Sequence, residues 1–331
     1  MKKHSFVSFL IKCVLAALPL IVLCLYTTLN PFGYMDQEYP SWHYERTMAR
    51  SANGYDTLVI GDSTAKAGMI PDVLGEDVIN LSMGGATPIE IYYAMEHYLD
   101  THEAPAHVFI MFTPYHYSFL DNFWQRTMYF NYLTTQETLE LFQTAKQNKD
   151  EEILSPNYQV DALAYRLRLP NKYLPAMINS RLIGRSDSNH EIYAQLIDSR
   201  GQSYFGTLDG CSDRNYESNY TALNLSPTVD IYMRRLLDLC TEHQINVIVE
   251  QAPMNTTSYE HLDPVYKQEY SDYMKLLKSD YPAITINTEI EHYEDTYYGD
   301  ASHLNEKGAH KFSGEMCDKY PDVFNQIERG E

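Results

Sequence analysis

Short apolar runs that alternate with helical segments constrain the fold of this chain more than any other feature of its sequence. Each run has the length and the apolar, often β-branched composition of a buried strand, and the runs occupy residues 56–61, 77–81, 107–112, 245–250 and 283–286. Segments with helical spacing of apolar residues occupy residues 88–102, 227–243, 262–279 and 304–319. Strands that alternate with helices predict an α/β fold, in which a parallel sheet is flanked by helices.

One long stretch interrupts this alternation. Residues 120–225 mix aromatic residues with Asn and Ser, and helical spacing returns only near 135–147 and 160–180. We interpret this stretch as a long, lid-like insertion within a single domain that covers residues 54–320. The polar and aromatic residues 31–53 are interpreted as a linker that leads into this domain.

The first 30 residues predict a membrane anchor. Lys2, Lys3 and Lys12 carry the only charges of this segment, and residues 13–26 form an uninterrupted apolar run. These fourteen residues are short for a span of about 20. Residues 6–11 supply the missing length if the Lys12 side chain snorkels toward the surface. The segment then crosses the membrane once, with its lysines in the cytoplasm and the rest of the chain outside.

A cleaved signal peptide is the main alternative for this segment, and a buried helix of a cytosolic protein is another. No small-x-small cleavage site follows the apolar run. A lipoprotein signal has a small residue before its cysteine, whereas Leu23 precedes Cys24. We therefore predict an uncleaved signal anchor in the cell membrane, with the C-terminal domain extracytoplasmic.

The charge of the chain is divided between these two parts. Residues 1–30 carry +3 and the remaining 301 residues carry −23, which together give the net charge of −20. So acidic a chain, without a basic stretch that follows a phosphate backbone, excludes nucleic-acid binding. The same bulk charge disfavours attraction to anionic lipid and to polyanions in general.

The first candidate catalytic residue is Ser63, in the segment Gly61-Asp62-Ser63-Thr64 directly after the first apolar run. A serine where a parallel strand turns into a helix lies at the carboxyl edge of the sheet, where α/β folds build their sites. The backbone N–H groups that open such a helix can stabilise an oxyanion. A turn followed by a helix N-cap explains the tetrapeptide equally well, and Asp62 suits that structural role.

The second candidate is the pair Asp300 and His303, three residues apart before the last helical segment. An aspartate at this spacing can orient the imidazole, which can in turn take a proton from a serine hydroxyl. An incidental histidine near a helix start is the alternative. The cysteines suggest no comparable chemistry, and Cys211, Cys240 and Cys317 allow at most one disulfide bond in the external part.

Together these motifs resemble the SGNH/GDSL hydrolase superfamily over residues 54–320. Gly61-Asp62-Ser63 matches the first block of that family and the segment Asp300-Ala-Ser-His303 matches the last, while residues 80–85 match the second block loosely. The third block differs, because residues 112–116 read Phe-Thr-Pro-Tyr-His where the family has an Asn whose side chain donates to the oxyanion. The resemblance implies a three-layer, flavodoxin-like SGNH fold with a long middle insertion.

Ile60–Ser63, Ile70–Leu74 and Asn80–Gly85 are similar to one membrane-anchored branch of this superfamily, which includes alginate O-acetylation proteins and the accessory protein of lipoteichoic-acid D-alanylation. The resemblance implies extracytoplasmic transfer of an acyl group, such as acetyl, to a polysaccharide, beside a membrane-bound O-acyltransferase and without a metal or cofactor. The acidic charge of the external part favours a neutral or amino-bearing polysaccharide over a uronic-acid polymer as the acceptor. An esterase or deacetylase, and a non-catalytic accessory protein, stay open as alternatives.

The resemblance also implies roles for individual residues. Ser63, Asp300 and His303 form the catalytic triad, and the oxyanion accepts hydrogen bonds from the N–H groups of Ser63 and of Gly85 or Gly84. Tyr115 and His116 occupy the place of the third block, where either can bind substrate or replace the absent Asn. An ordinary aromatic side chain at a strand end is the alternative for both.

Overall fold

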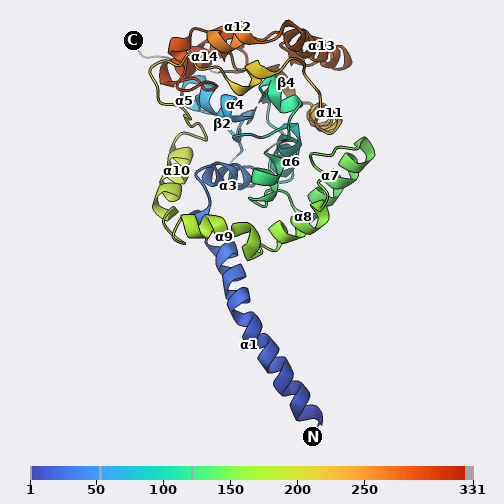
Figure 1. The fold of residues 1–331 in the computed structure, drawn as a ribbon. Helices are drawn as coiled ribbons and strands as arrows, with labels where there is room; N and C mark the ends of the chain where they lie inside the picture. Colours follow the sequence, from blue (N-terminus) through green and yellow to red (C-terminus); the bar gives the residue numbers. More distant parts are fainter. Residues whose placement is uncertain (1, 52–53, 121, 325–331) are drawn as a thin grey trace.

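A computed structural model describes residues 2–51, 54–120 and 122–324, with side chains from residue 6 onward. Residue 1 of the predicted anchor, residues 52–53 of the predicted linker and residue 121 of the predicted insertion lie outside the described residues. Figure 1 shows a domain of strands and helices from which one long helix, α1, projects.

Five strands form the central sheet, in the order β2-β1-β3-β4-β6, and every neighbouring pair is parallel. Their bounds are Thr57–Gly61 (β1), Val78–Asn80 (β2), His107–Met111 (β3), Asn246–Glu250 (β4) and Thr285–Ile286 (β6). The predicted α/β class and all five predicted strands are confirmed. Because β2 and β3 lie on opposite sides of β1, the carboxyl ends of β1 and β3 flank a topological switch point, where parallel α/β sheets bind their ligands.

Helices cover both faces of this sheet. Alternate strand residues point to opposite faces, so Leu58 and Val108 enter one core while Val59 and Phe109 enter the other. The first core contains residues of α6 (Pro88–Leu99), α11 (Pro227–Glu242) and α13 (Pro264–Asp280), and the second contains residues of α4 (Ser63–Gly68), α5 (Pro71–Leu74) and α14 (Glu306–Lys319). Burial on both faces explains why the strands read as continuous apolar runs.

Several short elements at the carboxyl side of the sheet were not expected from the sequence. They are η1 (Pro114–Tyr117), η3 (Tyr216–Asn219), β5 (Met254–Asn255), α12 (Thr256–His261), β7 (His292–Tyr293) and η4 (Asp295–Tyr297). The strands β5 and β7 form a separate parallel pair. Neither Met254–Asn255 nor His292–Tyr293 lies in an apolar run of the sequence, so neither strand was predicted.

The expectation of a linker at residues 31–53 is wrong for most of that segment. It contains α2 (Pro31–Tyr34) and α3 (Tyr39–Met48), and Trp42 and Tyr44 on α3 are among the most buried side chains of the domain. The sequence suggested a linker because polar residues alternate with the aromatic residues of α3 and leave no clear apolar periodicity. Burial of these large aromatic rings makes α3 part of the core.

Between β3 and β4 the described residues contain helices but no strand. The elements of this insertion are the π-helix η2 (Phe123–Met128), α7 (Thr135–Asn148), α8 (Tyr158–Arg166), α9 (Pro170–Asn179) and α10 (Ser186–Asp198). Figure 1 shows α7 to α10 as a curved row around one end of the domain. The helical pieces predicted near 135–147 and 160–180 are confirmed, whereas α10 was not predicted.

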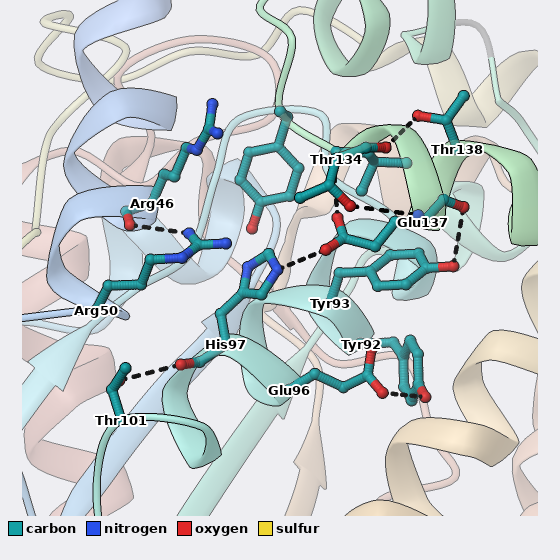
Figure 2. Close-up of polar contacts among 12 residues, drawn as sticks. Arg46, Arg50, Tyr92, Tyr93, Glu96, His97, Thr101, Thr134, Glu137 and Thr138 are labelled. Atoms are coloured by element: carbon teal, nitrogen blue, oxygen red, sulfur yellow. Dashed lines mark hydrogen bonds and ion pairs between the residues drawn. The ribbon is translucent and has the colours of Figure 1, made fainter.

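Polar contacts fix the start of α7 against α6 (Figure 2). Thr134 and Glu137 form a reciprocal capping box at the N-terminus of α7. The same Glu137 carboxylate lies 2.8 Å from Nε2 of His97 on α6, and the Tyr93 hydroxyl donates to the Glu137 carbonyl at 3.3 Å. These contacts attach the start of α7 to α6 in the helical layer of the sheet.

The N-terminal helix α1 (Lys2–Leu29) is long and apolar enough over Phe6–Leu29 to cross a membrane, a test that a signal sequence also passes. Its last turn is built into the domain. The Thr27 side chain is fully buried and donates to the Arg168 carbonyl at 3.0 Å, and the Tyr26 hydroxyl donates to the Leu182 carbonyl at 2.8 Å. Helix α1 thus contacts the insertion where it leaves the domain.

Candidate active site

The turn between β1 and α4 places Ser63 at the edge of the sheet. Gly61 has φ +152°, and a Cβ atom at this position would lie 1.8 Å from the Met111 carbonyl oxygen of β3. Only glycine therefore allows the two strand ends to approach this closely. Asp62 then caps α4 by accepting from the Thr64 N–H at 2.8 Å, and Ser63 is the first residue of the helix.

Three side chains form a continuous hydrogen-bonded relay. His303 Nε2 lies 2.8 Å from Ser63 Oγ, and His303 Nδ1 lies 2.9 Å and 3.0 Å from the two carboxylate oxygens of Asp300. Residues 240 positions apart in the chain are thereby brought into contact. This is the geometry in which an imidazole removes the proton of a serine hydroxyl while a carboxylate holds its ring.

Backbone contacts fix Asp300 in this arrangement. Its Oδ1 accepts from the N–H groups of Ser302 and His303 at 2.8 Å and 2.7 Å. Burial raises the pKa of Asp300, but the hydrogen bonds and the positive charge of a protonated His303, together with these N–H groups, outweigh burial and leave the pKa below its usual value. The carboxylate therefore stays ionised and can stabilise an imidazolium.

Asp62 has a structural position. Its side chain is fully buried, and besides the contacts to Thr64 it accepts from the Thr113 N–H at 2.7 Å and lies 2.6 Å from His116 Nδ1. Burial alone would raise its pKa, but His116 and the other donors lower the pKa to about 2. A carboxyl group so firmly ionised cannot act as a proton donor at neutral pH, which agrees with the turn role expected for Asp62.

His116 faces the same cavity as Ser63. The cavity has a volume of about 390 Å³, and Thr113, Tyr115 and His303 also line it. Because Asp62 engages Nδ1 of His116, the remaining ring nitrogen Nε2 is the one available for a ligand. The sequence segment that lacks the expected Asn thus brings an imidazole to the cavity that contains the Ser63 hydroxyl.

Aromatic side chains line this cavity or pack against the residues that line it. The Tyr115 ring stacks on Phe119 with centroids 4.9 Å apart and meets Tyr216 edge-on at 6.0 Å. Phe205 stacks on the imidazole of His303, a lining residue, with centroids 4.6 Å apart. Phe205 and Tyr216 come from the end of the insertion, and no motif in the sequence identified them.

Glu217 is a further cavity residue that sequence reasoning missed. Its side chain accepts from the Tyr115 N–H at 3.1 Å and from the Tyr266 hydroxyl at 2.5 Å. Burial raises its pKa to about 7, although the Tyr266 hydroxyl and His116 act in the opposite direction. A lone Glu in an aromatic stretch of sequence gives no signal of this environment.

Residues 80–85, the second sequence block, contain a buried Asn and a turn of two glycines. Asn80 is fully buried, and its side-chain amide donates to the carbonyls of Ala65 and Met69 in and after α4. Gly84 and Gly85 follow in a turn, and within the described residues their N–H groups have no hydrogen-bond acceptor. Neither glycine lines the cavity described above, although Gly84 lies against Phe205, the ring that covers His303.

Helix α3 and the insertion hold this glycine turn. The Gly84 carbonyl accepts from the Trp42 indole at 3.2 Å and from Arg126 at 3.1 Å. Gly85 has φ +73°, and a Cβ atom there would lie 2.0 Å from the Arg126 guanidinium. The left-handed backbone therefore favours glycine at this position.

A buried lysine connects α4 to the same region. Lys66 Nζ donates to the carbonyls of Ser82 and Gly201 at 3.0 Å and 2.7 Å. Burial lowers the pKa of Lys66 to about 7, while the carboxylates of Glu45 and Glu38 act to raise it. These contacts fix the helix that carries Ser63 relative to the glycine turn.

Among the described residues, no cluster of three or more His, Cys, Asp or Glu side chains has the arrangement of a metal site. Cys211, Cys240 and Cys317 are all free and buried. Comparison with protein-family models and with curated proteins finds no match to this chain.

Proposed function

We propose that this protein transfers acyl groups through an ester of Ser63, outside the cytoplasm. The observation that carries the proposal is the relay from Ser63 through His303 to Asp300, at the carboxyl edge of a parallel sheet and beside an open cavity. The fold supports membership of the SGNH/GDSL superfamily, because helices cover both faces of the sheet and the first and last sequence blocks meet in space.

The relay performs both halves of the reaction. His303 Nε2 takes the Ser63 proton while Oγ bonds to the acyl carbon, and the imidazolium then gives that proton to the leaving group of the donor. In the second half, His303 takes a proton from an acceptor hydroxyl, whose oxygen attacks the acyl carbon. The bond to Ser63 Oγ breaks, and Oγ recovers the proton from His303.

Three donors are proposed for the oxyanion of the tetrahedral intermediate. The Ser63 N–H has no hydrogen-bond acceptor within the described part of the chain, as expected at the first residue of a helix. Gly85, or Gly84, supplies a second N–H if the turn closes over the substrate. His116 Nε2 takes the place of the absent Asn as a donor when the ring is doubly protonated, with Nδ1–H held by the Asp62 carboxylate.

The proposed location rests on α1. Removal of α1 as a signal peptide would expose the core around Tyr34, whose hydroxyl donates to the Thr27 carbonyl at 2.5 Å, and would break the Thr27 contact to Arg168. The last turn of α1 therefore favours a retained anchor with the domain outside. The resemblance to polysaccharide O-acetylation proteins favours a polysaccharide acceptor and a membrane-bound O-acyltransferase as partner.

The test compares the purified full chain with Ser63→Ala in detergent. With 4-nitrophenyl acetate as donor and a neutral oligosaccharide as acceptor, we expect acetylated sugar and a trapped acetyl ester on Ser63. Ser302→Ala is the matched control, because the Ser302 side chain lines the cavity but the relay uses only its N–H. Release of acetate without acetylated sugar identifies an esterase instead. Normal turnover by Ser63→Ala refutes the serine mechanism.

A further inference from the structure

We propose that residues 158–185 form a collar that rests on the surface of an anionic lipid bilayer around the base of α1. The collar consists of α8, α9 and the turn that follows α9. This inference rests on the retention of α1 that is part of the proposed function, but not on the chemistry of Ser63.

The collar displays apolar side chains to an unusual degree. Among the described residues after residue 30, fourteen large apolar or aromatic side chains are exposed, and seven of them lie between residues 160 and 183. These seven are 42–69% exposed and are Val160, Leu163, Leu167, Leu174, Ile178, Leu182 and Ile183. Apolar patches of this kind on a protein surface mark contacts with a protein or a membrane.

Both collar helices are apolar on two sides. Ala162 on α8 and Tyr173 and Met177 on α9 are buried in the domain, which accounts for the inner side of each helix. On α9, Leu174 and Ile178 are one helical turn apart and lie on one exposed face. Packing within the domain does not explain this outer face.

The position of the collar at the base of α1 indicates that lipid contacts its exposed apolar side chains. Helix α9 contacts α1, and the Thr27 and Tyr26 contacts with Arg168 and Leu182 are contacts between α1 and the collar. Figure 1 shows α9 across the base of α1 and α8 next to it. A span that includes Phe6 and about 20 further residues ends near Tyr26, so the bilayer surface lies at the level of the collar.

The charge of the collar complements anionic headgroups. Asp161 is its only acidic residue, and its five basic residues are Arg166, Arg168, Lys172, Arg181 and Arg185. The collar carries a local charge of +4 in a chain of −20, so we propose attraction to anionic lipid at this surface although the bulk charge predicts none. Arg181 and Arg185 are exposed, and neither has an ion pair with any described residue. Basic and apolar side chains together are typical of helices that lie in a membrane interface.

This contact orients the active site. In Figure 1, α4 and α14, which flank Ser63 and His303, lie at the end of the domain opposite α1. A domain that stands on its collar therefore presents the cavity away from the bilayer. An acceptor polymer in the surrounding wall or medium can then reach Ser63 without contacting the lipid.

The test measures the surroundings of single fluorescent labels on the full chain in vesicles. Leu163→Cys and Ile178→Cys label the collar, and Leu276→Cys on α13 is the matched control because its side chain is similarly exposed, at 52% against 57% for Leu163. Cys13 and Cys24 are replaced by Ser in every variant. The vesicles contain phosphatidylglycerol and phosphatidylcholine in equal amounts, with a spin-labelled lipid as one quencher and aqueous iodide as the other.

We expect the labels at 163 and 178 to be quenched by the spin-labelled lipid and protected from iodide, and the label at 276 to show the opposite. Arg181→Glu with Arg185→Glu reduces lipid quenching at 178 in these vesicles but not in phosphatidylcholine alone. Iodide quenching at 163 and 178 equal to that at 276 overturns the proposal. So does protection that appears only in native membranes, which identifies a protein partner instead.

Failure of the collar and failure of the proposed function are separable. A chain that is inactive toward acyl esters still gives the predicted quenching pattern, because the labels do not report on Ser63. If the full chain does not co-float with the vesicles on a density gradient, α1 does not anchor it. This result refutes both the retained anchor and the collar.

Discussion

Replacement of Asp62 by Asn tests whether the carboxylate next to the nucleophile is structural. The fully buried Asp62 accepts hydrogen bonds from the N–H and hydroxyl of Thr64, from the N–H and hydroxyl of Thr113, and from His116. It thereby joins the start of α4 to the end of β3. A neutral amide has one acceptor oxygen in place of two and brings an NH₂ group toward these donors.

The expected loss of stability follows from the pKa and the contacts. Lowering of the Asp62 pKa from 3.8 to about 2 corresponds to about 2 kcal/mol of folding free energy at neutral pH. Buried donors left without an acceptor add about 1–3 kcal/mol. We therefore expect Asp62→Asn to reduce the free energy of unfolding by about 3–5 kcal/mol, the range found when buried ion pairs are broken.

Urea unfolding of the detergent-solubilised full chain, followed by tryptophan fluorescence, measures this loss. The matched control is Asp72→Asn, since Asp72 on α5 is also in an ion pair, with Arg200 at 2.7 Å, but its side chain is 72% exposed. Exposed pairs contribute up to about 1 kcal/mol. Equal, small losses of stability in both variants refute a structural role for Asp62. So does an Asp62→Asn variant that keeps full stability and loses only turnover, as expected of a general acid.

The contribution of Asp62 to stability depends on pH. The folded pKa of Asp62 lies below the unfolded value, so its contribution is present above about pH 4 and is lost as the pH falls toward 2. The Asp62→Asn variant lacks this component of acid sensitivity. An unchanged pH profile between 4 and 2 contradicts the assignment of Asp62 as an ionised structural group.

Three further predictions concern the cavity and the turn. His116→Ala should lower kcat by about 10²–10³-fold with little change in KM, because this is the loss expected for one oxyanion donor. A change in KM alone would instead indicate that His116 binds substrate. Glu217 has a folded pKa raised to about 7, so its ionisation destabilises the fold as the pH rises from about 4.5 to 7. Glu217→Gln should therefore be more stable than the wild type at pH 8 but not at pH 4. Thermal melts at both pH values measure this difference. Gly61→Ala should fail to give folded protein, because the added Cβ meets the Met111 carbonyl. Gly314→Ala inside α14 has no atom within 4 Å of its added Cβ and should raise the free energy of unfolding by about 0.5–1 kcal/mol. Soluble yield and melting temperature compare the two variants.

The predicted elements were those with strong local periodicity. The apolar runs of β1, β3 and β4 are buried on both faces, so they stand out in the sequence without any knowledge of their neighbours. Helix α3 was missed because its buried residues are aromatic and polar, and their burial depends on contacts with the insertion. The Trp42 ring, for example, packs against Phe130 and Tyr132 at 5.7 Å and 5.2 Å.

The candidate relay was predicted in part. Ser63, Asp300 and His303 were identified because each occupies a characteristic position beside a strand or helix end, and the structure brings all three together. Gly84 and Gly85 were also named, yet they lie outside the cavity described around Ser63. The roles of all these residues remain predictions that the Ser63→Ala comparison tests.

The sequence by itself determined the α/β class, the apolar N-terminal helix and the residues able to form a Ser-His-Asp relay, because strand burial, helix composition and side-chain chemistry are local properties. Only the tertiary structure decided that Asp62 engages His116, that Glu217 and Phe205 border the site, and that the exposed apolar residues of α8 and α9 gather at the base of α1. Each of these depends on residues distant in the chain. Their proximity follows from the packing of the insertion against the sheet, which no local pattern encodes.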